Sequence, residues 1–318
     1  MADTSNISSF GTAAYGGPGW SPRTATHAEE IGSIWCGGID SEWKRLRTVL
    51  LCRPGVEIVV DDVDAAQQLE ALDLVLAQEE HDALAEAYRS NGVRVLNVPE
   101  TSPATPNRMF CADLFAMTPQ GAILARPAST VRAGEEVAVA QSLATERVPL
   151  LRTLTGCATF EGADLIWLGP EAALLGKGLR TNAEAAGQIS ATLGELGTEV
   201  IDVDMPFGTM HLMGMLRIAD RDLAIAWPRR TPHAAVMALR AHGYAVHFLP
   251  ADEETMANRA LNFVTLGPRR ILMPAGNATV KTWYESLGIE VIETPMFELR
   301  KAAGAVGCLT GIVERDMG

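Results

Sequence analysis

Five polar residues that could take part in catalysis stand in otherwise apolar segments: Asp113, Glu161, His211, Asn262 and Cys308. A cysteine can supply a thiolate nucleophile, and a histidine can donate and accept a proton near neutral pH. Carboxylates bind cationic groups through charge-assisted hydrogen bonds. One site that held these side chains could combine nucleophilic attack, proton transfer and cation binding.

The five residues are far apart in the sequence, but each follows a similar stretch of chain. An Ala/Leu/Glu-rich helix pattern, a glycine and a short β-branched strand pattern recur roughly every 45 to 55 residues. The glycines are Gly92, Gly197, Gly243 and Gly288, and a copy without glycine lies at Arg147. Five copies indicate a repeat that closes into a ring. The alternative is chance recurrence in an ordinary doubly wound α/β domain.

A closed ring would bring the five polar residues together. Each lies a comparable distance after its copy of the helix–strand pattern, and equivalent positions of such a ring meet at its central axis. We therefore expect two carboxylates, the histidine and the cysteine to share one pocket. Asn262 is interpreted as a hydrogen-bonding residue at a strand end.

Residues 1–40 lack hydrophobic periodicity, and we interpret them as an N-terminal arm or lid. Residues 41–318 are predicted to form a single catalytic α/β domain. Its first strand is expected at residues 47–52 and a long amphipathic helix at residues 63–89.

The composition is that of a globular protein: 318 residues, 47% hydrophobic and 20% charged. The net charge of −13 and the absence of a Lys/Arg cluster argue against a nucleic-acid partner. A small cationic substrate suits this charge better.

The five cysteines are scattered and include no Cys-x-x-Cys pair, so neither a disulfide framework nor a zinc site is predicted. We expect a reducing, cytoplasmic location. The first 20 residues do not resemble an export signal, and no run of about 18 apolar residues suggests a membrane span. Dinucleotide, Walker, metalloprotease and EF-hand motifs were not found, so no cofactor and no metal are predicted.

Several short motifs, taken together and in order, resemble the pentein superfamily of arginine deiminases, dimethylarginine hydrolases and amidinotransferases. The resemblance extends over roughly residues 42–315 and rests on Phe110-Cys111-Ala112-Asp113, Arg126-Pro127 with Arg132, Glu161-Gly162-Ala163-Asp164, Gly178-Leu179-Arg180-Thr181-Asn182, His211-Leu212 and Gly307-Cys308-Leu309-Thr310. It implies a five-bladed α/β propeller of pseudo-repeats, in agreement with the periodicity.

The resemblance also implies roles for the catalytic residues. Cys308 would attack the guanidinium carbon, a poor electrophile that requires a strong nucleophile. His211 would protonate the departing amine and then activate the group that resolves the covalent intermediate. Glu161 would bind the guanidinium and orient His211.

Further residues are implied in substrate binding. Asp113 would bind the guanidinium nitrogens, and Asp164 would play a supporting or structural role. Arg132 and Arg180 would bind the α-carboxylate of the substrate, since the guanidinium fork matches a carboxylate.

Two positions depart from the pattern of many deiminases and amidinotransferases. Ala112 replaces an arginine, and Met213 replaces an aspartate two residues after the histidine. An apolar Met213 would leave room for an N-substituted group on the guanidine, so plain arginine deiminase activity is not expected.

The sequence therefore predicts a cysteine-dependent enzyme that hydrolyses a C–N bond of an arginine-like or N-substituted guanidino compound. The alternative is an amidinotransferase that passes the amidino group from arginine to an amine. A non-catalytic binding protein of the same fold is a third reading. The predicted partner is a small cationic guanidino substrate, with neither nucleic acid nor membrane, and a homodimer is considered as the assembly.

Overall fold

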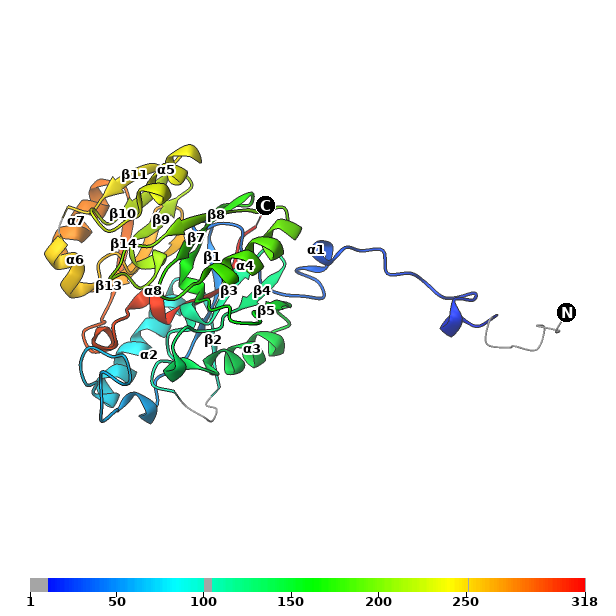
Figure 1. Ribbon diagram of the computed structural model, residues 1–318, viewed down its shortest axis with the longest axis horizontal. Coiled ribbons are helices and arrows are strands. Elements are labelled where there is room, and N and C mark those ends of the chain that lie inside the picture. Colours follow the sequence, from blue (N-terminus) through cyan, green and yellow to red (C-terminus); the bar gives the residue numbers. More distant parts are fainter. Residues whose placement is uncertain (1–10, 100–104, 251, 318) are drawn as a thin grey trace.

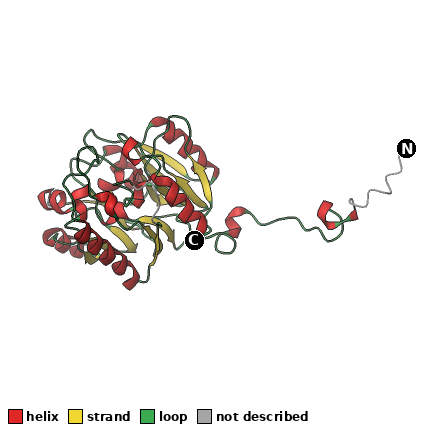
Figure 2. Cartoon of the chain, turned by 90° about the horizontal axis from the view of Figure 1, so that it is seen from below, coloured by secondary structure: helices red, strands yellow, loops and turns green. Residues whose placement is uncertain are grey.

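The protein is described by a computed structural model that covers residues 11–99, 105–250 and 252–317. It consists of a compact α/β body and an N-terminal segment that extends away from it (Figure 1, Figure 2). No helix in the described part of the chain is both long and apolar enough to cross a membrane.

The body repeats a unit of two antiparallel strands, a helix and a third strand parallel to the second. One such unit contains β6 (Leu165–Gly169), β7 (Ala172–Lys177), α4 (Ala183–Glu195) and β8 (Glu199–Asp204). Strand β7 pairs antiparallel with β6 and parallel with β8. The helix begins at Asn182, whose side chain accepts a hydrogen bond from the Ala185 amide, and it buries its apolar face.

Three other units follow the same order. The first contains β3 (Phe115–Thr118), β4 (Gly121–Leu124), α3 (Glu135–Thr145) and β5 (Leu150–Thr153). The second contains β9 (Leu216–Asp220), β10 (Leu223–Ala226), α5 (His233–Ala241) and β11 (Ala245–Phe248). The third contains β12 (Val264–Gly267), β13 (Arg270–Pro274), α7 (Ala278–Ser286) and β14 (Glu290–Thr294), and the additional helix α6 (Asp252–Asn258) precedes β12.

The fifth sheet is assembled from the two ends of the body. Strand β15 (Gly311–Arg315) pairs antiparallel with β1 (Leu46–Leu51), and β1 pairs parallel with β2 (Arg94–Asn97) after helix α2 (Leu74–Ser90). The described residues thus form five three-stranded sheets, in agreement with the five predicted repeats.

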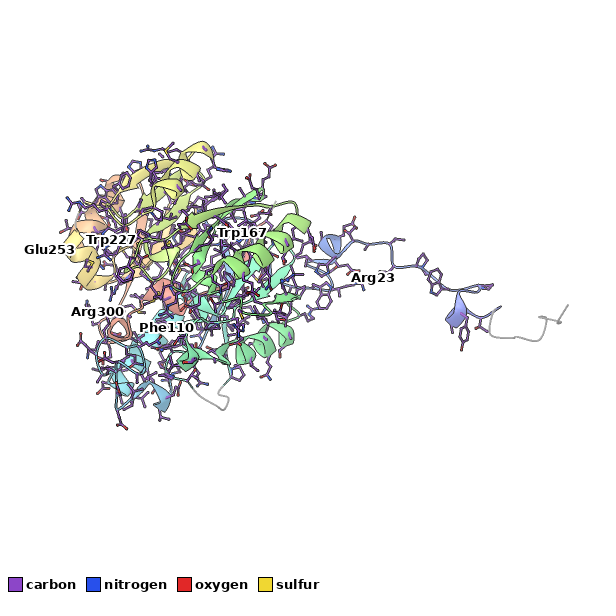
Figure 3. All side chains as sticks on the ribbon, in the orientation of Figure 1. Arg23, Phe110, Trp167, Trp227, Glu253 and Arg300 are labelled. Carbon is purple, nitrogen blue, oxygen red and sulfur yellow. The ribbon has the colours of Figure 1, made fainter. Side chains whose placement is uncertain are left out.

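Contacts between neighbouring sheets close a ring. Strand β15 contacts β3, and β3 contacts the 3-10 turn before β6. The turn before β9 contacts both β6 and β9, β9 contacts β12, and β12 contacts β1. Buried apolar side chains such as Trp167 and Phe110 fill the body (Figure 3). Segments that connect one unit to the next are therefore brought to the middle of the ring.

The glycine that marks each predicted repeat lies at a helix end and has a left-handed backbone conformation. Gly92, Gly197, Gly243 and Gly288 have φ angles of 74°, 82°, 86° and 77°. Arg147, in the copy without glycine, has φ 60°. The copy without glycine therefore keeps the backbone geometry that ends the helix. It lacks only glycine, the residue that adopts this geometry with the least strain.

The predicted helix at residues 63–89 is wrong in its first part, because α2 begins at Leu74. Residues before it form turns, and Gln67 has φ 61°. The side chain of Asp73 accepts hydrogen bonds from the Val75 and Leu76 amides, which fixes the helix start there. The first strand, expected at residues 47–52, is β1.

The described part of the N-terminal arm, residues 11–40, contains the short helix α1 (His27–Glu30). Its last part docks on the body, where Cys36 N donates to the Arg147 carbonyl and Gly38 N to the Val313 carbonyl. No described arm residue lines the two pockets that contain Cys308. A lid function of the arm stays a prediction, and residues 1–10 lie outside the described residues.

Candidate active site

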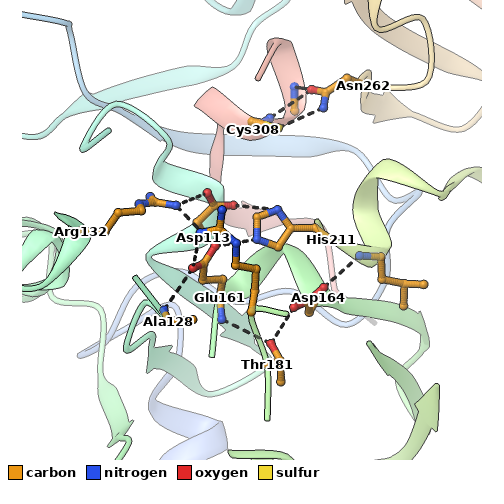
Figure 4. Close-up of polar contacts among 12 residues, drawn as sticks. Asp113, Ala128, Arg132, Glu161, Asp164, Thr181, His211, Asn262 and Cys308 are labelled. Atoms are coloured by element: carbon orange, nitrogen blue, oxygen red, sulfur yellow. Dashed lines mark hydrogen bonds and ion pairs between the residues drawn. The ribbon is translucent and has the colours of Figure 1, made fainter. Parts of the chain in front are cut away.

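The five polar residues singled out by their spacing lie on the connections between units. Asp113 ends a 3-10 turn (Cys111–Asp113) before β3, and Glu161 and His211 each precede the turn before β6 and β9. Asn262 lies just before β12, and Cys308 lies in the short helix α8 (Val306–Leu309) before β15. The ring brings them to one site, where Cys308 and Asn262 lie on one side of the group formed by Asp113, Glu161 and His211 (Figure 4).

His211 is bound to both carboxylates. Its Nε2 lies 2.6 Å from Oε2 of Glu161, and its Nδ1 lies 3.7 Å from Oδ1 of Asp113. Burial alone would lower the pKa of His211, but Asp113, the hydrogen bond to Glu161 and the charge of Asp164 together raise that pKa to about 9. His211 is therefore a protonated imidazolium at neutral pH.

Glu161 is fully buried, yet its pKa lies below the ordinary value of a glutamate. Burial favours its neutral form, but the hydrogen bond to His211 and the nearby cations Arg132 and Arg180 lower its pKa to about 2. The Ala128 amide also donates to Oε1 at 3.2 Å. Glu161 thus holds His211 in its charged form and fixes the ring.

The two arginines predicted to bind a substrate carboxylate contact these acids. Arg132 donates to Asp113 at 2.7 Å and to Glu135 at 2.8 Å, and its Nη1 lies 3.4 Å from Glu161. Arg180 Nη1 lies 3.2 Å from Glu161. Arg132 Nη2 and Arg180 Nε have no hydrogen-bond partner among the described residues. Binding of a substrate carboxylate stays a prediction for both.

Asp164 acts on the backbone next to the histidine. It accepts hydrogen bonds from Thr181 Oγ1 at 2.6 Å and from the Leu212 amide at 2.9 Å. Burial raises its pKa to about 6, although these bonds and His211 oppose the shift. These contacts fit the supporting role expected for it, because they fix the chain that follows His211.

Cys308 is held by Asn262, whose importance the sequence reasoning underestimated. Asn262 Nδ2 donates to the Cys308 sulfur at 3.0 Å, and its Oδ1 accepts from the Gly307 and Cys308 amides at 2.7 and 3.2 Å. The expected strand-end hydrogen bonder is thus the residue that positions the thiol. Its equivalent place in the repeat was the signal for this role.

Arg217, on the buried strand β9, is a residue that the sequence reasoning missed. Its Nη2 packs so closely under Gly307 that a Cβ there would overlap it, and its Nε and Nη2 have no partner among the described residues. Burial and Asp113 raise the pKa of the Cys308 thiol, while Asn262 and Arg217 lower it. A lone arginine in an apolar strand was the available sequence signal.

Arg217 borders a cavity of about 70 Å³. Arg315 and Glu42 also line this cavity, and Arg315 Nε has no partner among the described residues. The cavity therefore contains two cations and one carboxylate. A thiolate at Cys308 would supply a second negative charge close to Arg217.

Met213 is 7% exposed and packs with Ala112, Ala163 and Cys308 in a small apolar cluster. The two positions that depart from the family pattern, 112 and 213, thus lie together next to Cys308. Asp113 lines the smaller pocket at Cys308, which Met213 does not line.

Asp113, Glu161 and His211 also place one ligand atom each within 4.8 Å of one another, a spacing that could hold a metal ion. Arg132 contacts both carboxylates and His211 is protonated, so cations already occupy this group. The pairing of these donors with Arg132 and His211 argues against a metal ion at this position.

Comparisons with known proteins agree with this geometry. A family model described as "N,N dimethylarginine dimethylhydrolase, eukaryotic" matches residues 64–226. The N(G),N(G)-dimethylarginine dimethylaminohydrolase of Streptomyces coelicolor is 27% identical over 76% of this chain and 87% of its own length. The uncharacterized protein YkgA of Bacillus subtilis is 25% identical over 85% of this chain and 92% of its own.

A solved structure shares the fold at lower identity. The inosamine-phosphate amidinotransferase of Streptomyces griseus is 16% identical, with a TM-score of 0.73 over 89% of this chain and 97% of its own. Fold, site and comparisons define a member of the guanidino-group-modifying, or pentein, superfamily. Within it, the chain belongs to the dimethylarginine dimethylaminohydrolase family, whose model matches about half of the sequence.

Proposed function

We propose that this protein hydrolyses a C–N bond of an arginine-like or N-substituted guanidino compound through a covalent thiouronium intermediate on Cys308. The observation that supports this proposal best is the buried Glu161–His211 pair, which lies with Asp113 next to the pocket of Cys308. We further propose that the five sheets are the blades of a five-bladed α/β propeller with the site on its axis.

The first half-reaction uses the charges already present. The pKa of the Cys308 thiol lies above its ordinary value. The positive charge of a guanidinium bound beside Asp113 would lower that pKa and so promote release of the thiol proton. The thiolate forms a C–S bond to the guanidinium carbon, and the C–N bond of the departing amine breaks. Protonated His211 gives its proton to that amine, since Glu161 keeps it charged before the reaction.

The second half-reaction reverses the proton transfer. Neutral His211 accepts a proton from water, whose oxygen attacks the thiouronium carbon. The C–S bond then breaks, the departing Cys308 sulfur takes up the remaining proton of the attacking water, and a ureido compound is the product.

An amidinotransferase is the alternative, and the structural similarity to the Streptomyces griseus enzyme favours keeping it. The same first half-reaction would then be resolved by an amine instead of water. A non-catalytic role is less compatible with a site in which cysteine, histidine and two acids are all present.

The test is incubation with arginine, N-methylated arginines, agmatine and guanidinoacetate, with and without amines, followed by mass analysis of products and protein. We expect a ureido product and an adduct on Cys308. Cys308→Ser should lose at least about a thousandfold in kcat/KM. Cys111→Ser, which alters a buried cysteine of another connection, should retain most activity. Near-normal turnover by Cys308→Ser would refute the mechanism.

A further inference from the structure

Cys308 and His211 lie between two pockets of different size and chemistry. The first measures about 30 Å³ and contains Asp113, Arg132 and Arg180. The second measures about 270 Å³ and is lined by Met213, which does not line the first. A cavity of about 150 Å³ accommodates benzene, so the second pocket has room for more than a few methyl groups.

The wall of the second pocket is apolar and cationic. Its apolar lining includes Met210, Met213, Met215, Met256, Leu261 and Trp227. Arg230 and Arg259 also line it, and the Arg230 guanidinium lies 4.4 Å from the centre of the Trp227 ring. Trp227 lies in the half of the body formed by the β9–β11 and β12–β14 units (Figure 3).

No aspartate or glutamate occurs among the described residues that line this pocket. Among these lining residues a guanidinium finds no carboxylate partner, whereas Asp113 lines the first pocket. With its carbon at Cys308, a guanidinium would direct one nitrogen toward Met213. A substituent on that nitrogen would enter the second pocket.

We propose that this pocket binds the N-substituent of the substrate guanidine, and that the substituent is a large apolar or aromatic group that carries a carboxylate. The apolar walls exclude water around its body, and the arginines bind its anionic end. This assignment rests on the proposed function. The substituent leaves as part of the amine when the C–N bond breaks and His211 supplies the proton.

The experiment compares arginines whose guanidine nitrogen carries a methyl, a benzyl or a 4-carboxybenzyl group. We expect kcat/KM to rise by about tenfold or more from methyl to benzyl, and again to 4-carboxybenzyl. Arg230→Met and Arg259→Met should each remove most of the second gain and leave turnover of the methyl compound unchanged. Arg240→Met, at an exposed position on α5, is the matched control and should change none of these ratios.

Two outcomes separate this inference from the proposed function. If the methyl compound is turned over through a Cys308 adduct but the larger compounds are not, the pocket assignment is wrong and the enzyme mechanism stands. If no compound forms an adduct and none binds to Cys308→Ser by calorimetry, both are wrong. If the two arginine substitutions affect the benzyl and 4-carboxybenzyl compounds equally, the arginines do not bind an anionic end of the substituent, and only the apolar part of the assignment stands.

Discussion

Replacement of Glu161 by Gln tests the origin of the charged state of His211. The wild-type pKa of His211 is about 9, and Glu161 lies 2.6 Å from its Nε2. A hydrogen bond to a charged partner contributes about 1.5–3 kcal/mol, and one pKa unit corresponds to about 1.4 kcal/mol. Loss of the carboxylate charge should therefore lower the pKa of His211 by about 1 to 2 units.

The assay is an NMR titration of ¹³C/¹⁵N-labelled histidine in a Cys308→Ser background. A range of roughly pH 5 to 10 covers both the protonated and the neutral state of the imidazole. Glu135→Gln is the control, because Glu135 bonds Arg132 and has no hydrogen bond to His211 among the described residues. It should leave the His211 pKa near its wild-type value. A pKa that stays at about 9 in Glu161→Gln would show that Asp113 and Asp164 alone set the charge, and the reasoning about Glu161 would be wrong.

Four further predictions concern neighbouring groups. Arg217→Met should raise the pKa of Cys308, measured as the pH dependence of iodoacetamide labelling, whereas an unchanged profile would remove Arg217 as its counter-charge. Arg180→Leu should raise KM for arginine much more than for agmatine, and equal increases would exclude a role for Arg180 in binding the α-carboxylate. Wild type should prefer an N-substituted guanidine over arginine, and Met213→Asp should shift kcat/KM toward arginine; a wild type that strongly prefers arginine contradicts the reading of Met213. The pKa of His211 is raised above its ordinary 6.5, so its stabilising contribution is complete below about 6.5 and is lost as the pH rises through about 9. Thermal denaturation should therefore show a fall in Tm over that interval that is smaller in Glu161→Gln.

The sequence predicted the repeat and the positions of the polar residues because both depend on local chain geometry. The helix end at Arg147 illustrates this, since its place in the pattern was visible without glycine and its φ of 60° agrees. The spacing of Asp113, Glu161, His211 and Cys308 then sufficed to place them around one axis.

Other parts of the site depend on contacts between distant units, which spacing does not reveal. Arg217 lies in β9 and Gly307 in α8, and their close packing follows from the approach of β9 to the segment before β15. Asn262 resembled any polar residue before a strand until its bonds to Cys308 were visible. Residues 63–73 have helix-forming composition, but Asp73 caps the helix and delays its start.

The pairing of β1 with β15 has a consequence for how activity appears during folding. Thr48 and Glu314, which share a hydrogen bond in this sheet, are 266 residues apart, so the pairing closes one of the longest loops available to the chain. Cys308 lies directly before β15 and reaches its place only when that strand docks. A chain in which the other four sheets have formed would hold the histidine and both acids in place, but not Cys308. Formation of the Cys308 adduct should therefore be a specific kinetic probe of the final closure step in refolding.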